Sequence, residues 1–239
     1  MTVRKTIAIF GAGTGLGSSL AHKFGREGYQ VALVARRVNA LEELVFSLAS
    51  SGITAEAFSY DLTDLSGIPN LVRSIEDKLG KIDVAVYAPV SPGPNLALAS
   101  AIDSSKLQSA AGLFLYSPVE LSHTLLPRML ERRDGAIVLV GGLSAVIPMP
   151  GLSPLGQIMA ATRNYALTLN AEVLQQGVYV GSVSIGALID RSAGKNALEA
   201  SGIELNVPII DPDDIAEEIW TVVSRRDRAE VILPPLTTI

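Results

Sequence analysis

Four closely spaced glycines near the amino terminus have the spacing of a loop that can bind an anion. An apolar run at residues 7–10 leads into them, and a helical pattern follows. Gly11 would permit a tight turn, Gly15 would let the backbone approach a pyrophosphate, and Gly17 would let the helix pack closely on the strand. The free N–H groups that open this helix would face the anion. The loop predicts a dinucleotide site, although a tight turn without a ligand has the same spacing.

Two arginines follow the second apolar run and bear on which dinucleotide would bind. The chain there reads Val34-Ala35-Arg36-Arg37 and has no carboxylate. A carboxylate would hold the ribose hydroxyls of NAD, whereas a guanidinium suits the 2′-phosphate of NADP. Arg36, with Arg37 beside it, therefore favours NADP(H). The alternative is a solvated arginine pair at the start of a helix.

These segments resemble the short-chain dehydrogenase/reductase family over nearly the whole chain. Gly11, Gly15 and Gly17 match the family's Gly-x-x-x-Gly-x-Gly loop, and Asp61-Leu62-Thr63 is similar to its adenine-contacting segment. The resemblance implies an NADP(H)-dependent oxidoreductase. The residues that we expect at the cofactor are Gly11, Gly13, Thr14, Gly15, Leu16, Gly17, Arg36, Arg37, Asp61, Leu62, Ala88 and Gly186.

The chain departs from this family at the chemistry. The family's catalytic asparagine, serine, tyrosine and lysine fall on Ser109, Gly142, Leu155 and Met159, and no Tyr-x-x-x-Lys occurs in the chain. In the family, the tyrosine exchanges a proton with the substrate oxygen and the lysine lowers its pKa. General acid–base catalysis of this kind contributes about 10²–10⁴ in rate. The losses argue against ordinary alcohol and ketone chemistry, and they leave the catalytic residues unknown.

Several residues could substitute for the missing groups, each with an ordinary alternative. Ser144 lies two residues beyond Gly142 and could turn inward, or it could be an exposed loop serine. Tyr87 could contact the ligand, act as a displaced acid, or simply pack. Arg163 lies one helical turn beyond Met159, where a surface arginine is the favoured interpretation. His22 and His123 are expected at a helix surface and at a packed or interface position.

Composition excludes several classes of function. The formal charge of −5 argues against a surface for nucleic acid or anionic membrane, and the absence of cysteine removes thiol chemistry. With two histidines, we expect no metal site. Prolines and glycines interrupt the uncharged stretch 135–162, so we expect no membrane span. We expect a cytoplasmic protein.

Apolar runs alternate with helical patterns along the whole chain, which predicts parallel strands joined by helical crossovers. The expected fold is a single-domain, doubly wound parallel α/β sheet of the Rossmann-like type, over residues 1–239. The expected strands are 6–10, 30–35, 55–59, 84–87, 136–140, 178–184 and 230–233. The expected helices are 15–27, 40–50, 68–79, 104–132, 153–175 and 213–224.

Residues 187–209 form the longest stretch without a clear pattern. In a doubly wound sheet such a segment can cover the ligand site, so it is either a substrate lid or a surface insertion. The two long helices at 104–132 and 153–175 carry more apolar residues than one sheet-facing stripe needs. We therefore expect a homodimer or homotetramer.

Two functions of different classes remain open from the sequence. The first is an NADP(H)-dependent oxidoreductase that transfers hydride to a small hydrophobic carbonyl or enoyl compound by a non-standard mechanism. The second is a catalytically inactive NADP(H)-binding sensor or partner subunit. A weaker third interpretation, a fold that has lost the nucleotide, conflicts with the intact glycine loop.

Overall fold

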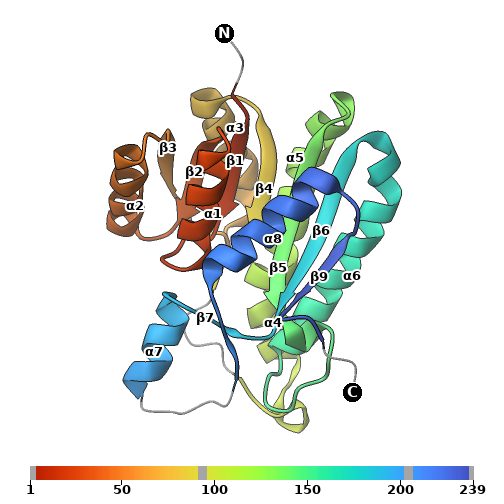
Figure 1. Ribbon diagram of the computed structural model, residues 1–239. Coiled ribbons are helices and arrows are strands. Elements are labelled where there is room, and N and C mark those ends of the chain that lie inside the picture. Colours follow the sequence, from red (N-terminus) through yellow and green to blue (C-terminus); the bar gives the residue numbers. More distant parts are fainter. Residues whose placement is uncertain (1–3, 91–95, 202–206, 237–239) are drawn as a thin grey trace.

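A parallel sheet of seven strands forms the centre of the computed structural model, which describes residues 4–90, 96–201 and 207–236. The strand order is β3-β2-β1-β4-β5-β6-β9, and each neighbouring pair is parallel (Figure 1). The strands are β1 (Thr6–Phe10), β2 (Gln30–Ala35), β3 (Ala55–Ser59), β4 (Ile82–Tyr87), β5 (Gly135–Gly142), β6 (Val178–Ile185) and β9 (Glu230–Leu233). The predicted doubly wound sheet is confirmed, with each expected strand present.

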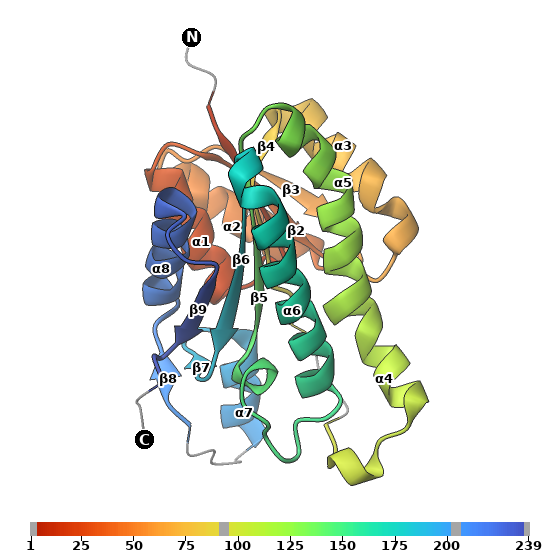
Figure 2. The same cartoon turned by 90° about the vertical axis from the view of Figure 1, so that its right-hand side faces the viewer.

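Helices cover both faces of this sheet (Figure 2). The core on one face takes side chains from α1 (Leu16–Arg26), α2 (Val38–Ser50) and α8 (Pro212–Arg225). The core on the other face takes them from α3 (Ile68–Leu79), α5 (Ser117–Glu131) and α6 (Leu155–Val173). The sheet therefore lies between two helical layers, and a ligand can reach it at the ends of its strands.

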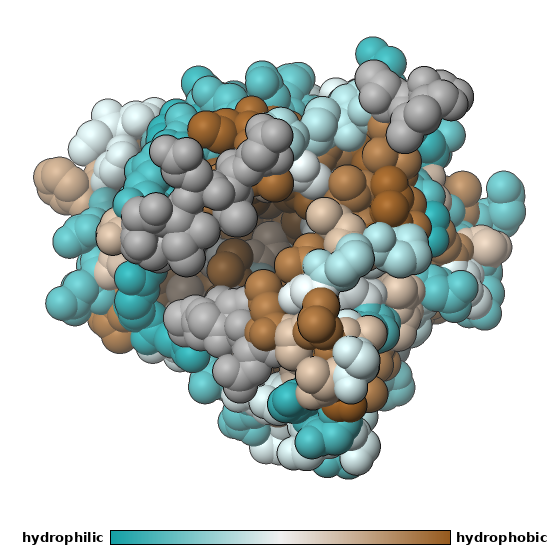
Figure 3. All heavy atoms as spheres, turned by 90° about the horizontal axis from the view of Figure 1, so that it is seen from below, coloured by the Kyte–Doolittle hydropathy of each residue, from teal (hydrophilic) through white to brown (hydrophobic). Residues whose placement is uncertain are grey.

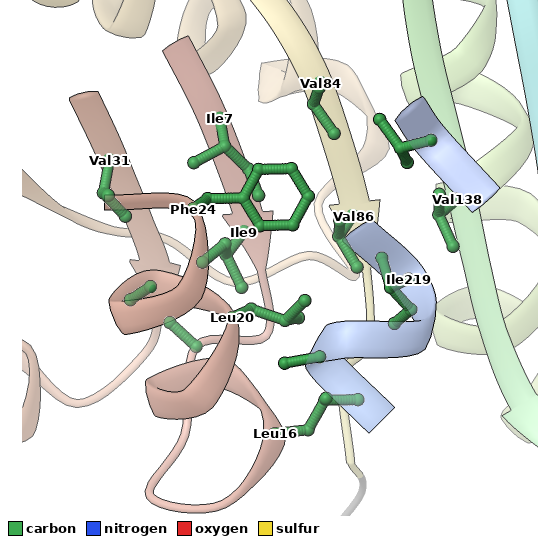
Figure 4. Close-up of a cluster of buried hydrophobic side chains, with 14 of the residues drawn as sticks. Ile7, Ile9, Leu16, Leu20, Phe24, Val31, Val84, Val86, Val138 and Ile219 are labelled. Atoms are coloured by element: carbon green, nitrogen blue, oxygen red, sulfur yellow. The ribbon is translucent and has the colours of Figure 1, made fainter. Parts of the chain in front are cut away.

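Strand β1 shows why these apolar runs become central strands. All five of its residues are buried, and successive side chains point to opposite faces. Ile7 and Ile9 join the core under α1 and α8, whereas Ala8 and Phe10 join the core on the other face. Figure 4 shows Ile7 and Ile9 packed with side chains from β4 and α8. A run without polar alternation is what a strand buried on both faces requires.

The expected helix 104–132 is present as an unbroken helical run over residues 104–131, but it is not α-helical throughout. The structure divides it into α4 (Ser104–Ala111), a wider turn of π-helix (Gly112–Tyr116) and α5. Pro118 has no N–H to give, so it cannot bond the carbonyl of Phe114 as an α-helix would. That carbonyl accepts a bond from the Thr162 hydroxyl instead, at 2.5 Å, and the carbonyl of Leu113 accepts one from the Tyr87 hydroxyl, also at 2.5 Å. Proline therefore breaks the α-helical ladder, and side chains from neighbouring elements bind the freed oxygens.

The segment predicted to be a lid contains secondary structure that the sequence pattern missed. Two short parallel strands, β7 (Leu188–Ile189) and β8 (Ile209–Ile210), pair with each other, and α7 (Ala193–Ser201) lies between them in the chain. Residues 202–206 of the expected lid lie outside the described residues. Short turns of 3-10 helix occur at Leu65–Gly67, Ala99–Ala101, Leu143–Ala145 and Leu174–Gln176.

Candidate functional site

A hollow lies at the carboxyl ends of the strands (Figure 3). The loops that follow β1, β4, β5 and β6 all reach this edge, since parallel strands share one direction. Large apolar side chains are exposed in these loops and beyond β9: Val90, Leu96, Leu98, Ile147, Met149, Val207, Ile209 and Leu236. The carboxyl edge is therefore an apolar surface around a depression, as a site for an apolar ligand requires.

The glycine loop is shaped by crowding that only glycine permits. Gly11 has φ +97°, and a Cβ built on it would lie 2.5 Å from the backbone of Pro89. A Cβ on Gly17 would lie 2.8 Å from the Cα of Ala12. Close packing of this kind brings helix α1 directly against the turn that follows β1. The roles expected for these two glycines thus agree with the geometry.

The other residues of the glycine loop differ in their surroundings: some face open space and others are buried in the core. Gly13 has no other atom closer than 4.0 Å to an added Cβ, and Thr14 is exposed. Gly15 caps helix α1 without a side-chain hydrogen bond, so the first N–H groups of the helix lack a side-chain partner. The Leu16 side chain is buried in the core (Figure 4), so only its backbone could contact a ligand.

Gly15 also contacts Ser192 in the segment after β7, a relationship that the sequence did not suggest. A Cβ on Gly15 would lie 2.9 Å from the Cβ of Ser192. Ser192 in turn accepts a hydrogen bond from the N–H of Lys195, at 3.1 Å, at the start of α7. The only signal in the sequence was a serine three residues before a lysine in an uncertain stretch, which is too common to single out.

The arginines at the end of β2 are exposed. Within the described ranges, the Arg36 and Arg37 guanidinium groups form neither an ion pair nor a hydrogen bond. Arg37 precedes helix α2, whose first turn carries no acidic residue. An anion at this position would therefore meet two uncommitted positive charges at a helix start.

Asp61 and Leu62, beyond β3, differ in their exposure. Asp61 is exposed and accepts bonds from the backbone and hydroxyl of Thr63, at 3.0 and 2.8 Å. These bonds, with the nearby Arg36 charge, hold the pKa of Asp61 below its usual value. Leu62 is buried in the core. Asp61 therefore stays ionised and is held in a fixed turn.

Ala88 and Gly186 continue the sheet by one residue at its carboxyl edge. The N–H of Ala88 donates to Phe10 at 2.8 Å, and that of Gly186 donates to Leu233 at 2.6 Å. A Cβ on Gly186 would lie 2.6 Å from the Leu143 side chain. Both residues are thus backbone positions at the rim of the hollow.

Met159 and Gly142 are brought into contact behind this rim. The Met159 Sδ lies 3.2 Å from the Gly142 nitrogen and accepts its N–H. Leu155 and Met159 also pack against a small cluster formed by Ala111, Phe114 and Ile158. Ser109 lies on α4 and is exposed. A thioether, a glycine and a leucine offer no proton donor of useful acidity.

A comparison with protein families matches the short chain dehydrogenase family to residues 5–198. The chain belongs to the short-chain dehydrogenase family. The "Dehydrogenase/reductase SDR family protein 7-like" of Anopheles gambiae is 29% identical over 97% of this chain and 75% of its own length. This family membership accounts for the glycine loop.

Solved structures share the fold of this short-chain dehydrogenase. L-sorbose reductase from Gluconobacter frateurii, complexed with NADPH and L-sorbose, superimposes with a TM-score of 0.81 at 22% identity, covering 98% of this chain and 96% of its own. A short chain oxidoreductase from Pseudomonas aeruginosa PAO1, described as containing an atypical catalytic center, gives a TM-score of 0.79 at 19% identity, covering 95% and 94%. At these identities the likeness concerns the fold.

Of the substitutes considered for this short-chain dehydrogenase, Ser144 lies beside the family's serine position. Its Oγ is 3.6 Å from where a Cβ on Gly142 would be. In the described part of the chain, the Ser144 hydroxyl has no hydrogen-bond partner. The hydroxyl is thus free to meet a ligand at this position.

The polar groups of Tyr87 and Arg163 are bonded to other protein groups. Tyr87 is 3% exposed, its hydroxyl donates to the Leu113 carbonyl, and burial raises its pKa well above the usual value. Arg163 forms a two-point ion pair with Glu230 on β9, at 2.5 and 2.8 Å. The geometry favours the packing interpretation of Tyr87, and it makes Arg163 a link between α6 and the edge strand.

A small cavity of about 20 Å³ lies beside Met159, room for about one water molecule. Its polar lining includes the hydroxyls of Thr162, Ser182 and Ser184, which the sequence analysis did not single out. The alternation of serines in β6 was the available signal, but buried serines in strands are common.

The histidines lie outside this region. His22 bonds the Ser18 carbonyl within α1 through Nδ1, at 2.9 Å, and His123 is exposed on α5. Among the described residues, no three His, Asp or Glu side chains gather where they could hold a metal. No helix within the described ranges is long and apolar enough to cross a membrane.

Proposed function

We propose that this protein binds NADP(H) and transfers hydride between it and a small hydrophobic carbonyl or enoyl compound by a non-standard mechanism. The observation that carries the proposal is the glycine loop, which has crowded Gly11 and Gly17, an open Gly13 and a start of α1 without a side-chain cap. That loop suits a pyrophosphate, because free N–H groups and the helix dipole both favour an anion. The residues present therefore fit the cofactor.

The phosphate of NADP(H) is the part of the cofactor that Arg36 and Arg37 would hold. Both guanidinium groups are exposed and uncommitted within the described ranges. Asp61, fixed by Thr63, would lie on the adenine side. A guanidinium pairs with phosphate oxygens through two parallel hydrogen bonds, whereas it has no comparable partner on a free ribose hydroxyl. The pair thus supports NADP(H) over NAD(H).

The substrate would lie in the apolar hollow, with residues 187–209 acting as its lid. NADPH, when bound, would supply the hydride. The chain's own contribution is to orient the two reactants and leave Ser144 as the free hydroxyl beside Gly142. A polarised double bond can take its proton from solvent after hydride transfer, so a tyrosine acid is not required.

A second candidate is a catalytically inactive NADP(H)-binding sensor or partner subunit. The contact between Met159 and Gly142 favours it, because the space of two catalytic groups is filled by a thioether and a bare backbone. Both candidates need the cofactor, and they differ in hydride transfer alone.

Two remaining expectations stay predictions. A homodimer or homotetramer would cover the apolar residues of α5 and α6 that the sheet leaves partly exposed, among them Leu126, Leu130 and Leu167. Sedimentation equilibrium would decide the subunit number. The absence of cysteine agrees with a reducing cytoplasm, which localisation of the tagged protein would test.

The deciding experiment is a titration with NADPH and NADH, followed by a single-turnover reaction. We expect tighter binding of NADPH, and we expect Arg36→Gln to remove most of that preference. Arg73→Gln, an exposed arginine on α3, is the matched control. Mixing the NADPH complex with α,β-unsaturated aldehydes should then oxidise NADPH, which is measured as a fall in its absorbance. Binding without consumption would favour the inactive binder, and failure to bind either dinucleotide would refute both candidates.

A further inference from the structure

A second pocket lies at the amino ends of the strands, at the edge of the sheet opposite the glycine loop. Its volume is about 370 Å³, within the range of small-molecule sites. Lys5 precedes β1, Tyr29 precedes β2, and Asp134 precedes β5, while Trp220 and Arg226 come from the last turns of α8 and the residue after it. The proposed cofactor site uses none of these residues.

One wall of this pocket is aromatic and held rigidly. The rings of Tyr29 and Trp220 lie edge to face with centroids 5.9 Å apart, and Phe24 packs against both at 5.4 and 5.1 Å. Val84 and Val223 add aliphatic surface to the same lining. Such a wall offers a preformed surface for a flat apolar group.

Two of the charged groups in the lining are already engaged. Asp83 accepts bonds from Lys81 at 2.5 Å and from the Thr6 backbone at 2.9 Å, which occupies both of its oxygens. Arg226 bonds one oxygen of Asp134 and the carbonyl of Gly177, both at 2.9 Å. These groups shape the pocket but have little left to offer a ligand.

The polar groups of the lining that have no partner among the described residues are mainly hydrogen-bond donors. Within the described ranges, the Lys5 ammonium and the hydroxyls of Tyr29 and Ser224 make no hydrogen bond or ion pair. The second oxygen of Asp134 is the corresponding acceptor. Burial and the two carboxylates raise the pKa of Tyr29, so its hydroxyl remains a neutral donor. A ligand that accepts hydrogen bonds fits this set.

The local charge is mixed, with cations and carboxylates close together. Four cations interact electrostatically with the two aspartates of the lining: Lys5, Lys81, Arg132 and Arg226. Lys5 and Arg226 also line the pocket themselves. At the Tyr29 hydroxyl the carboxylates Asp83, Asp134 and Glu27 outnumber the single cation Arg226, so the attraction for an anion has to come from the Lys5 ammonium, which is unpaired in the described part of the chain. The whole chain carries −5.

We propose that this amino-end pocket binds a small organic acid with a flat apolar body. The carboxylate of the ligand meets the Lys5 ammonium and the Tyr29 and Ser224 hydroxyls. The flat body lies against the wall formed by Tyr29 and Trp220. The proposal does not depend on cofactor binding, because the two sites lie at opposite edges of the sheet.

Trp220 is the only tryptophan of the chain, so its emission reports on this pocket directly. Titration with sodium benzoate should change that emission saturably. Sodium acetate, which lacks the apolar body, and benzylamine, which carries the opposite charge, should bind much more weakly. Lys5→Gln should weaken benzoate binding about three- to fivefold, in the range expected for an exposed charge pair. Lys106→Gln on α4 is the matched control and should bind benzoate like the parent protein.

NADPH titrations on the same variants separate this site from the cofactor site. We expect Lys5→Gln to bind NADPH like the parent protein. The proposal is overturned if benzoate gives no saturable change at millimolar concentration, if benzylamine binds equally well, or if Lys5→Gln leaves benzoate affinity unchanged. Tyr29→Phe keeps the aromatic wall and removes one donor, so it should also weaken benzoate binding.

Discussion

The Met159 sulfur accepts the backbone N–H of Gly142, with 3.2 Å between Sδ and N. The sequence resemblance predicts that these two positions correspond to the family's lysine and serine. A contact between them means that one non-catalytic side chain occupies the space beside the other. We therefore expect the two substitutions to act together as one packed arrangement.

Restoring the tyrosine and lysine alone should not restore ketone reduction. In Leu155→Tyr with Met159→Lys, position 142 would still lack a hydroxyl and Ser109 would still be exposed. Leu155 also packs with the cluster of Ala111, Phe114 and Ile158, which a tyrosine would disturb. NADPH oxidation against a panel of simple ketones measures this. Robust turnover by the double variant would contradict the prediction.

Tyr87→Phe and Ser144→Ala should have opposite effects on stability and rate. Removing the Tyr87 hydroxyl leaves the Leu113 carbonyl without that bond, which should cost about 1–2 kcal/mol of unfolding free energy and leave hydride transfer unchanged. Removing the Ser144 hydroxyl should leave stability nearly unchanged and slow any reduction about tenfold or more. Urea midpoints and single-turnover rates distinguish the two. A slower reaction in Tyr87→Phe, at unchanged stability, would make Tyr87 the displaced acid.

Gly17→Ala should destabilise the protein and weaken NADPH binding. The added Cβ would lie 2.8 Å from the Ala12 Cα, a backbone atom that cannot move aside cheaply. We expect a loss of about 1–3 kcal/mol in unfolding free energy. Gly112→Ala is the control, since its Cβ meets nothing within 4 Å and it lies in a helical turn. That variant should be neutral or stabilised by about 0.5–1 kcal/mol. Equal effects of the two variants would count against the crowding argument.

Acid should remove the stability that Asp134 contributes. Burial opposes the shift, but Arg226 and nearby lysines hold the pKa of Asp134 below its usual value. A lowered folded-state pKa means that this stability is present above the unfolded pKa, near 4, and is lost as the pH falls through the folded value. Because both partners are about one-third exposed, we expect less than about 1 kcal/mol.

The matching variant is Asp134→Asn, compared with the parent protein by urea unfolding at neutral pH and near pH 3. It should be less stable at neutral pH, and the difference should shrink in acid. A difference that stays constant across this range would show that the carboxylate charge is not responsible.

The strands and the glycine loop could be predicted because their signals are local. A run such as residues 7–10 is apolar at every position, and only a strand buried on both faces suits it. The π-helical turn after Ala111 has a weaker signal, because Pro118 is tolerated in the first turn of a helix. Its position depends on Thr162 and Tyr87, which contact the freed carbonyls from distant elements.

The candidate site was predictable only in part for the same reason. Gly11 and Gly17 were recognised from spacing, and the structure shows the crowding that requires them. The contact of Gly15 with Ser192 could not be foreseen, because it joins segments far apart in the chain. The commitment of Arg163 to Glu230 likewise depends on where the last strand lies.

The packing of Gly11 against Pro89 has a consequence for synthesis. Strand β1 lies between β2 and β4, and the backbone that confines its glycine turn comes from the residues after β4. On the ribosome, the turn leaves the exit tunnel long before Pro89 does. The nascent chain therefore carries the nucleotide loop early but completes its walls only once β4 has emerged, so an arrested chain ending before Pro89 would lack a finished site.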